Sequence, residues 1–295
     1  MQPDRGMIAN ITGVLACRES DIRKFQRIRE GLTNSSFSFE AGEKKYVYRH
    51  PGEGTEAIIS RVHEKKALEL AKSIGADPTF IHMDEKSGWK LSAFVEGIRM
   101  PSYDSTEDSR RVLDVMKKLH EKKLSVDWSF LPWEEAVKIE SLLREGKGGI
   151  ADPGFESLKE RVEKCYRKCE GDGIEMRFCH CDTYAPNWML TETETILIDW
   201  EYAGNADPGC DIGTYIMDSM WEVPEAERFI EMYCGEHMTE TQRFHYLAYA
   251  AILSYYWYVW ALYRESCGAD TGESLHNWRV MAKRYSDYLT ESQRL

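Results

Sequence analysis

The sequence contains no apolar run of 18 or more residues and no signal-peptide pattern of basic residues followed by an apolar segment. A helix that crosses a membrane needs about 20 mostly apolar residues. The most apolar stretch, residues 246–263, contains several Tyr and Trp residues, and the first ten residues carry charge and proline. We therefore expect a cytoplasmic protein that does not interact with a membrane.

An excess of basic residues is also absent. The chain has 38 Lys and Arg residues against 50 Asp and Glu residues, which gives a formal net charge of −12. Proteins that bind nucleic acid present a basic face, so this balance argues against a nucleic acid as partner. It suits a cationic ligand, whereas an anionic nucleotide requires basic side chains or a metal ion at its own site.

Cysteine pairs of the C-x-x-C type are missing, although the chain has eight cysteines. They are scattered over the sequence. Cys165 and Cys169 stand one helical turn apart, and Cys179 and Cys181 alternate as on a strand. Because cytoplasmic proteins keep most thiols reduced, we expect free and mostly buried cysteines. A zinc site is the alternative.

Alternating and helical periodicities divide the chain into two parts. Aromatic and β-branched residues alternate in residues 37–40 and again in 46–49, which predicts a β-hairpin. Further strands are predicted at 79–83 and 89–95, and helices at 55–74, 109–124, 133–143, 155–169 and from 224 to the end. We expect an α+β protein with a small β-rich lobe, residues 1–97, and a larger, mostly helical lobe, residues 98–295.

The segment from His180 to Asp199 combines the residue types that phosphoryl transfer requires. It reads His-x-Asp-x-x-x-x-Asn as far as Asn187, and then contains an Ile-Leu-Ile run that ends at Asp199. Phosphoryl transfer needs a carboxylate beside the acceptor hydroxyl and ligands for a metal ion. Asp182 is the candidate for the first role, and Asn187 and Asp199 offer oxygen ligands for Mg²⁺. The alternative is a polar hairpin in which Asp and Asn only form turns.

Several motifs in order resemble the choline/ethanolamine kinase family, which belongs to the aminoglycoside-phosphotransferase-like group. They are segments 31–37, 46–55, 61–64 and 94–97, followed by 180–187 with 198–213, and together they cover roughly residues 28–280. In particular, the sequence resembles bacterial choline kinases that supply phosphocholine for surface decoration. The resemblance implies a two-lobed protein-kinase-like fold, ATP as phosphate donor and Mg²⁺ as cofactor.

The resemblance also implies roles for individual residues. Arg49 takes the place of the phosphate-binding lysine and Glu64 that of its ion-pair partner. The planar guanidinium group of an arginine presents several N–H donors in a fixed geometry, so it can bind a phosphate and a carboxylate at the same time. Further nucleotide-binding residues are expected in the phosphate loop and in the hinge, namely Thr33, Asn34, Ser35, Phe94, Val95 and Glu96. His180 is expected to hold the catalytic loop by hydrogen bonds, and Asp211 to brace it from below.

Three positions depart from the family pattern. Tyr184 and Pro186 vary the interior of the catalytic loop, so the geometry of this loop stays open. Asp218 stands where the family often has Glu, which keeps the carboxylate but shortens its reach.

Residues 253–263 place six aromatic side chains on an expected helix of eleven residues. A trimethylammonium group binds to aromatic faces, because it cannot donate a hydrogen bond. Trp257 and Trp260 share a helix face and match the W-x-x-W choline wall of the family, with Tyr202 and Asp218 as further substrate-binding candidates. The alternative is a buried core helix. An aminoglycoside pocket would show clustered acidic residues, which this segment lacks.

We therefore expect a choline kinase that transfers the γ-phosphate of ATP to the hydroxyl of choline and releases phosphocholine and ADP. The alternatives are an ethanolamine kinase or another small-alcohol or aminoglycoside-type phosphotransferase, and a pseudokinase that binds without turnover. The presence of Asp182, Asn187 and Asp199 argues against the pseudokinase. The protein is expected to act as a monomer or homodimer.

Overall fold

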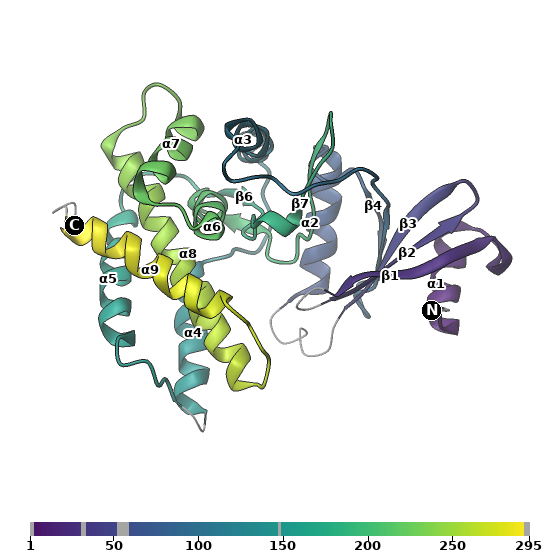
Figure 1. Ribbon diagram of the computed structural model, residues 1–295, viewed down its shortest axis with the longest axis horizontal. Helices are drawn as coiled ribbons and strands as arrows, with labels where there is room; N and C mark the ends of the chain where they lie inside the picture. The colour runs from purple at the N-terminus through teal and green to yellow at the C-terminus, as the bar shows by residue number, and fades with distance from the viewer. Residues whose placement is uncertain (1–2, 31–33, 52–58, 147–148, 292–295) are drawn as a thin grey trace. The chain divides into compact units, whose positions relative to one another are not determined.

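Alternating aromatic residues build an antiparallel sheet near the beginning of the chain. The computed structural model (Figure 1) describes residues 3–30, 34–51, 59–146 and 149–291. Five strands pair in the order β1-β2-β3-β5-β4. Their bounds are β1 Ile22–Glu30, β2 Asn34–Ala41, β3 Lys44–Pro51, β4 Phe80–Met83 and β5 Lys90–Ala93. The predicted hairpin is confirmed as β2 and β3, and the two further predicted strands are confirmed as β4 and β5.

One face of this sheet is covered by a helix that the sequence analysis did not predict. Helix α1, Arg5–Leu15, places Ile11 in a core with Phe39, Leu91 and Tyr48 of the sheet. Asn10 on the same helix donates a hydrogen bond of 2.9 Å to the Tyr48 hydroxyl. Helix α1 therefore contributes to the core of the sheet.

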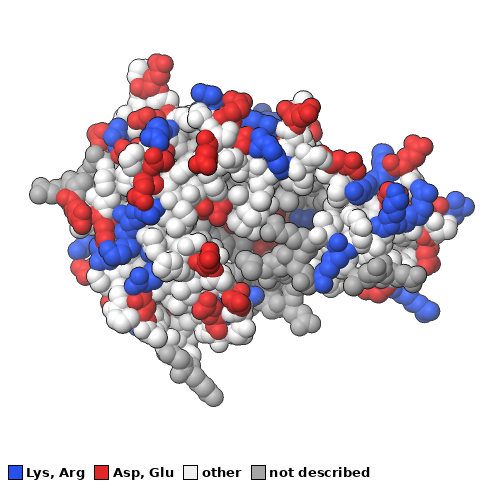
Figure 2. Space-filling model, in the orientation of Figure 1, with Lys and Arg blue, Asp and Glu red and all other residues white. Residues whose placement is uncertain are grey.

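The outer strand β1 is protected by charge. Its exposed residues include Arg23, Lys24 and Arg27, and Figure 2 shows basic side chains around this part of the molecule. Charged side chains on an edge strand discourage pairing with another chain. Lys24 also pairs with Glu40 of β2 at 2.7 Å.

The chain divides into two compact units. The first comprises Met1–Arg99 with Met189–Tyr202, and the second comprises Met100–Trp188 with Ala203–Leu295. The first unit holds the sheet, α1, helix α2 (Arg61–Ser73), strand β8 (Thr195–Leu197) and most of its partner β7 (Trp188–Leu190). The predicted helix 55–74 is observed from Arg61, where Ser60 caps it, and its residues 55–58 lie outside the described part of the chain.

The second unit is mostly helical, as the sequence predicts. Its helices are α3 Thr106–Glu121, α4 Pro132–Glu145, α5 Phe155–Cys169, α6 Gly209–Ser219, α7 Val223–Cys234, α8 Glu240–Ser266 and α9 Ser274–Glu291. Two short strands, β6 (Arg177–Cys179) and β9 (Gly204–Ala206), pair antiparallel. Helix α8 is central, because α4, α5, α6, α7 and α9 all pack against it, and α9 lies along it in Figure 1.

Helices α6 and α8 approach each other at two glycines. A Cβ atom on Gly209 would lie 2.3 Å from the ring of Tyr249, and one on Gly213 would lie 2.7 Å from the Tyr249 backbone. No side chain fits at these distances, so glycine allows α6 to lie directly on α8. Among the described residues, no helix is long and apolar enough to cross a membrane.

One carboxylate ties three segments of the second unit together. Asp152, in the segment before α5, accepts hydrogen bonds from the Tyr258 hydroxyl on α8 (2.7 Å) and from Arg279 Nε on α9 (2.6 Å). The Arg279 guanidinium is the main cause that holds the pKa of Asp152 well below its ordinary value. An ionised Asp152 therefore stabilises the helical unit.

We predict that Asp152→Asn lowers the free energy of unfolding at pH 7 by about 1.5–3 kcal/mol, as expected for hydrogen bonds to a charged group. Because folding lowers the pKa of Asp152, this stabilisation is fully present above the pKa of Asp152 in the unfolded chain, about 3.9, and is lost as the pH falls through the lower pKa of the folded protein. Urea unfolding at pH 7 and at about pH 2 measures the difference. The control Glu135→Gln, in an exposed pair with Lys138, should change little. An Asp152→Asn deficit that is the same at both pH values would contradict this account.

Candidate active site

Arg49 on β3 joins two of the acidic residues that the sequence analysis singled out. Its guanidinium group forms ion pairs with the carboxylates of Glu64 on α2 and of Asp199. Arg61 Nη1 lies 2.9 Å from Glu64 Oε2, and Lys90 Nζ lies 3.8 Å from Glu64 Oε1. Glu64 is 1% exposed and Arg49 is 6% exposed. Salt therefore screens the ion pair between them less than a pair on the surface.

The charges of this cluster shift one another's pKa. Burial alone would lower the pKa of Arg49, but the carboxylates of Glu64, Asp199 and Glu201 raise it. Burial, followed by the charge of Asp199, raises the pKa of Glu201 to about 8. Burial and the nearby Arg49 lower the pKa of Lys90. Arg49 thus stays charged at every physiological pH.

Asp199 is positioned by the backbone around it. Leu197 N donates to Ala76 O at 3.0 Å, and Trp200 Nε1 donates to Leu197 O at 2.9 Å, with Trp200 fully buried. Asp199 itself has a left-handed φ of 70°. Carboxylate oxygens of Glu64, Asp199 and Glu201 lie within 4.8 Å of one another. This set of hard oxygen donors has the chemistry that Mg²⁺ prefers.

The predicted phosphate loop and hinge are described in part. Thr33 lies outside the described residues, Asn34 begins β2, and Ser35 Oγ accepts a hydrogen bond of 3.1 Å from Arg27. The hinge follows β5, and Phe94 N donates to Lys45 O at 3.0 Å. Lys45 Nζ lies 3.5 Å from the centre of the Phe94 ring and 3.6 Å from Glu96. Val95, between them, is half-buried.

The predicted catalytic loop is held by the buried carboxylate of Asp211, on the first turn of α6. Asp211 Oδ1 accepts from Cys181 N at 2.6 Å, and Oδ2 accepts from His180 N at 3.2 Å. The two hydrogen bonds hold these amides in place. They do so even though Cys181 has the unfavourable left-handed φ of 67°. The Thr183 hydroxyl donates to the backbone oxygen of Asp211 at 2.6 Å. The expectation that Asp211 braces this loop is confirmed.

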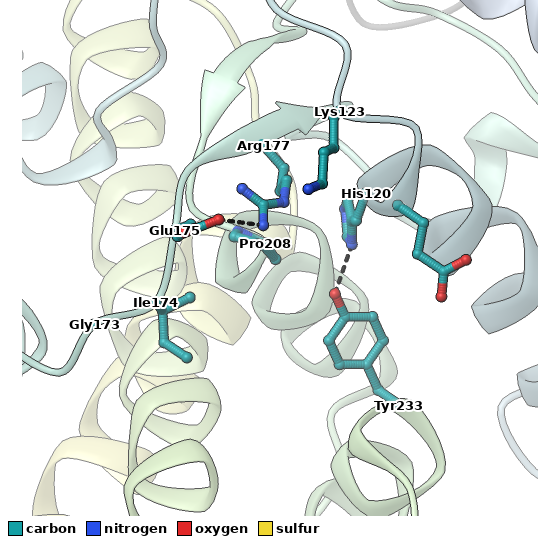
Figure 3. Close-up of a pocket in the computed structure, with 9 residues that line it drawn as sticks. His120, Lys123, Gly173, Ile174, Glu175, Arg177, Pro208 and Tyr233 are labelled. Atoms are coloured by element: carbon teal, nitrogen blue, oxygen red, sulfur yellow. Dashed lines mark hydrogen bonds and ion pairs between the residues drawn. The ribbon is translucent and has the colours of Figure 1, made fainter.

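His120 on α3 extends this network to the surface. Its Nε2 lies 2.9 Å from Asp211 Oδ2, and its Nδ1 lies 2.7 Å from the Tyr233 hydroxyl. Figure 3 shows His120 and Tyr233 on the wall of a pocket of about 470 Å³. Burial alone would raise the pKa of Asp211, but the hydrogen bond and charge of His120 lower it. Asp211 is therefore an ionised carboxylate that is fully buried.

Within the loop, Asp182 and Asn187 contact each other directly. Asn187 Nδ2 donates to the Asp182 backbone oxygen at 2.8 Å and to Asp182 Oδ2 at 2.9 Å. Because the amide nitrogen faces Asp182, the amide oxygen of Asn187 points to the other side. His180 Nδ1 accepts from Asp182 N at 3.2 Å, and His180 is fully buried. His180 thus holds the loop, as expected.

Asp218 contacts the interior of the same loop. Its Oδ2 accepts a hydrogen bond of 2.8 Å from Ala185 N and another from the Tyr103 hydroxyl. Burial raises the pKa of Asp218. Tyr202, the other polar candidate for the acceptor site, is half-buried and belongs to the first unit.

The aromatic residues of α8 point to several different neighbours. Tyr255 stacks on Trp133 of α4 at 5.7 Å, and Tyr256 meets Phe130 edge-on at 5.3 Å. These two are core residues. Trp257 and Trp260 instead gather with a third indole, Trp278 of α9, which the sequence analysis missed.

These three residues form what we call the indole cluster. Ring centroids are 5.5 Å apart for Trp257 and Trp260, 5.7 Å for Trp257 and Trp278, and 6.3 Å for Trp260 and Trp278. Trp257 and Trp260 are each 5% exposed, whereas Trp278 is half-buried. No sequence pattern pointed to Trp278, because it lies alone on a helix of mixed composition.

The predicted residues therefore fall into two groups. Arg49, Glu64 and Asp199 come together in the first unit. The second unit contains the Asp182–Asn187 pair, Asp218 and the indole cluster. Arg61, Lys90, Glu201, Tyr103 and His120 are further members of these groups that the sequence analysis did not name as site residues.

Comparisons with known proteins identify the family. A model described as "Phosphotransferase enzyme family" matches residues 24–248, and the chain belongs to this family. Protein LicA of Haemophilus influenzae is 26% identical over 254 residues, which cover 82% of this chain and 74% of the relative.

Two solved structures are similar over nearly their whole length. Choline kinase LicA from Streptococcus pneumoniae has a TM-score of 0.81 at 24% identity and covers 96% of this chain and 98% of that chain. A choline/ethanolamine kinase family protein from Mesorhizobium loti has a TM-score of 0.79 at 19% identity and covers 96% of this chain and 94% of that chain. The expected family relationship and the expected protein-kinase-like fold are confirmed.

We predict that Asp211→Asn destabilises the second unit. The amide group cannot accept hydrogen bonds from Cys181 N, His180 N and His120 at once, and each buried donor left unpaired costs about 1–3 kcal/mol. Thr183→Val removes only one bond to the backbone of residue 211 and should cost clearly less. Thermal unfolding followed by near-ultraviolet circular dichroism measures both. Equal melting temperatures for wild type and Asp211→Asn would contradict the bracing role.

Proposed function

We propose that this phosphotransferase is a Mg²⁺- and ATP-dependent choline kinase, which transfers the γ-phosphate of ATP to the hydroxyl of choline and releases phosphocholine and ADP. The observation that carries the proposal is the indole cluster in the same unit as the Asp182–Asn187 pair. The similarity to choline kinase LicA supports it. ATP as donor is consistent with the cytoplasmic location expected from the sequence.

The indole cluster suits a quaternary ammonium group. Such a group has no N–H to donate and binds through the negative faces of aromatic rings, at about 0.5–2 kcal/mol for each ring. A cation of the protein itself already lies over the ring of Trp260. The guanidinium carbon of Arg264 is 5.5 Å from the centre of that ring. The half-buried Trp278 offers a ring that a ligand can reach from solvent.

Asp218 supports choline over ethanolamine. A primary ammonium group needs acceptors for three N–H bonds, and Asp218 is the carboxylate among the substrate-binding candidates. Its Oδ2 is already used by Ala185 N and by the Tyr103 hydroxyl. Burial also raises the pKa of Asp218, so it offers a primary ammonium group only its other oxygen and a weakened charge, which favours binding by the aromatic faces.

We propose that Arg49, with Glu64 as its orienting partner, binds the phosphates of ATP. The Arg49 Nε atom is buried and has no hydrogen-bond partner within the described part of the chain, so a phosphate oxygen would satisfy it. Asp199 and Asn187 are the residues that we propose to hold Mg²⁺, through carboxylate and amide oxygens. When bound, Mg²⁺ neutralises the charge that develops on the phosphates.

In the proposed reaction Asp182 accepts the proton of the choline hydroxyl as the oxygen attacks the γ-phosphorus. The bond from the γ-phosphorus to the bridging oxygen breaks, and that oxygen leaves with ADP. Asn187 Nδ2 keeps the Asp182 carboxylate in place by the bond of 2.9 Å. Positioning and charge neutralisation supply most of the catalysis, as in other phosphoryl transfers.

We predict that Asp182→Asn lowers kcat by about 10²- to 10⁴-fold, the range for a lost general base, and leaves ATP affinity nearly unchanged. The control Asp114→Asn, on the exposed side of α3, should keep full activity. Steady-state kinetics with choline and calorimetric titration with ATP measure the two effects. Turnover within a factor of a few of the wild type would remove Asp182 from the mechanism.

We further predict that Trp260→Ala raises the KM for choline about tenfold or more, from the loss of roughly 1.5 kcal/mol of ring attraction and apolar contact. The KM for ATP should hardly move. Trp133→Ala is the matched control, because Trp133 is equally buried but packs on Tyr166 and Tyr255. It should lower the melting temperature without a choline-specific effect. If Trp260→Ala behaves like Trp133→Ala, the indole cluster is core and not an acceptor site.

A further inference from the structure

A second group of metal-ligating side chains lies in the helical unit, apart from every residue used above. Cys169 is the last residue of α5, Asp172 follows it by three positions, and His245 lies on α8. One ligand atom from each of the three lies within 4.8 Å of the other two. Cys169 is 7% exposed and His245 is fully buried.

The imidazole of His245 is held between two carboxylates. Its Nδ1 contacts the Asp172 carboxylate, and its Nε2 lies 2.8 Å from Asp207 Oδ1 on the opposite side. The ring is stacked on Tyr249 at 4.7 Å and meets Tyr246 edge-on at 5.1 Å. Histidines that bind a metal commonly donate their other ring N–H to a carboxylate, which fixes the tautomer and orientation.

We propose that Cys169 Sγ, an Asp172 carboxylate oxygen and His245 Nδ1 bind a Zn²⁺ ion, with Asp207 as the partner that orients His245. A thiolate, an imidazole and a carboxylate form a ligand set typical of zinc. Mg²⁺ and Ca²⁺ prefer oxygen ligands alone.

Binding balances the charges of this buried group. When the ion binds, the Cys169 thiol releases its proton to solvent, and so does Nδ1 of a protonated His245, which then binds the ion as a neutral imidazole with its remaining proton on Nε2. The two positive charges of the ion then face the thiolate and the carboxylate of Asp172, while Asp207 accepts a hydrogen bond from Nε2–H of His245.

The pocket of Figure 3 is lined by residues that adjoin the proposed site in the sequence. These residues are Gly173 and Ile174, which follow Asp172, and Pro208, which follows Asp207. The site joins the end of α5 to α8. Asp207 also lies just before α6, which carries the loop-holding Asp211. The ion therefore has a structural role in the helical unit, and the proposal does not depend on which acceptor the enzyme uses.

Elemental mass spectrometry of the full-length protein, purified without chelators from zinc-supplemented cells, tests the proposal. We expect about one zinc ion for each chain in the wild type, and none above background in Cys169→Ser. Cys165→Ser is the matched control, because Cys165 is a buried cysteine one turn earlier on α5 and takes no part in the site. Equal zinc contents in both variants and the wild type would overturn the assignment.

Titration of metal-free wild type with Co²⁺ gives a second test, which stands even if Cys169→Ser fails to fold. We expect a thiolate-to-cobalt charge-transfer band that zinc abolishes, and Asp207→Asn should weaken zinc binding by about 10- to 100-fold. A wild type that shows no such band and contains no zinc would overturn the proposal. His245 would then be a protonated imidazolium that pairs with the carboxylates of Asp172 and Asp207.

Discussion

The loop that carries Asp182 and Asn187 depends on one buried carboxylate, that of Asp211. A fully buried carboxylate is tolerated only when hydrogen bonds and charge compensate for the water it has lost. Asp211 receives two backbone amides of the loop and the imidazole of His120, and it stands in the first turn of α6, where the helix dipole favours a negative charge. Gly209 and Gly213 let that helix lie on α8. The left-handed backbone at Cys181 is therefore imposed by tertiary structure.

In the first unit an equivalent constraint is the burial of Arg49. The whole chain is acidic, with a net charge of −12, and yet its proposed phosphate site must attract an anion. Arg49, Arg61 and Lys90 meet that need locally, and the carboxylates of Glu64 and Asp199 keep Arg49 charged. An arginine in place of a lysine suits this position, since its guanidinium group contacts two carboxylates at once.

The sequence predicted the fold class well, because the features that determine it are local. Alternation at residues 37–49 and helical spacing at 155–169 are visible without tertiary contacts, and both elements were found. Helix α1 was missed because its burial depends on a sheet formed by later residues. Trp278 and Tyr103 were missed for the same reason, since each joins its site only when distant segments pack together. The proposed zinc ligands also lie on distant segments, and their spacing matches no sequence motif.

The central claim is that the indole cluster selects a quaternary ammonium alcohol for phosphorylation by this enzyme. The most direct measurement is the initial rate of ADP release with ATP and Mg²⁺, using choline, ethanolamine or kanamycin as the acceptor. The account predicts a kcat/KM for choline well above that for ethanolamine, and no acceptor-dependent rate with kanamycin. Preference for ethanolamine or kanamycin, or ADP release that no acceptor increases, would contradict it.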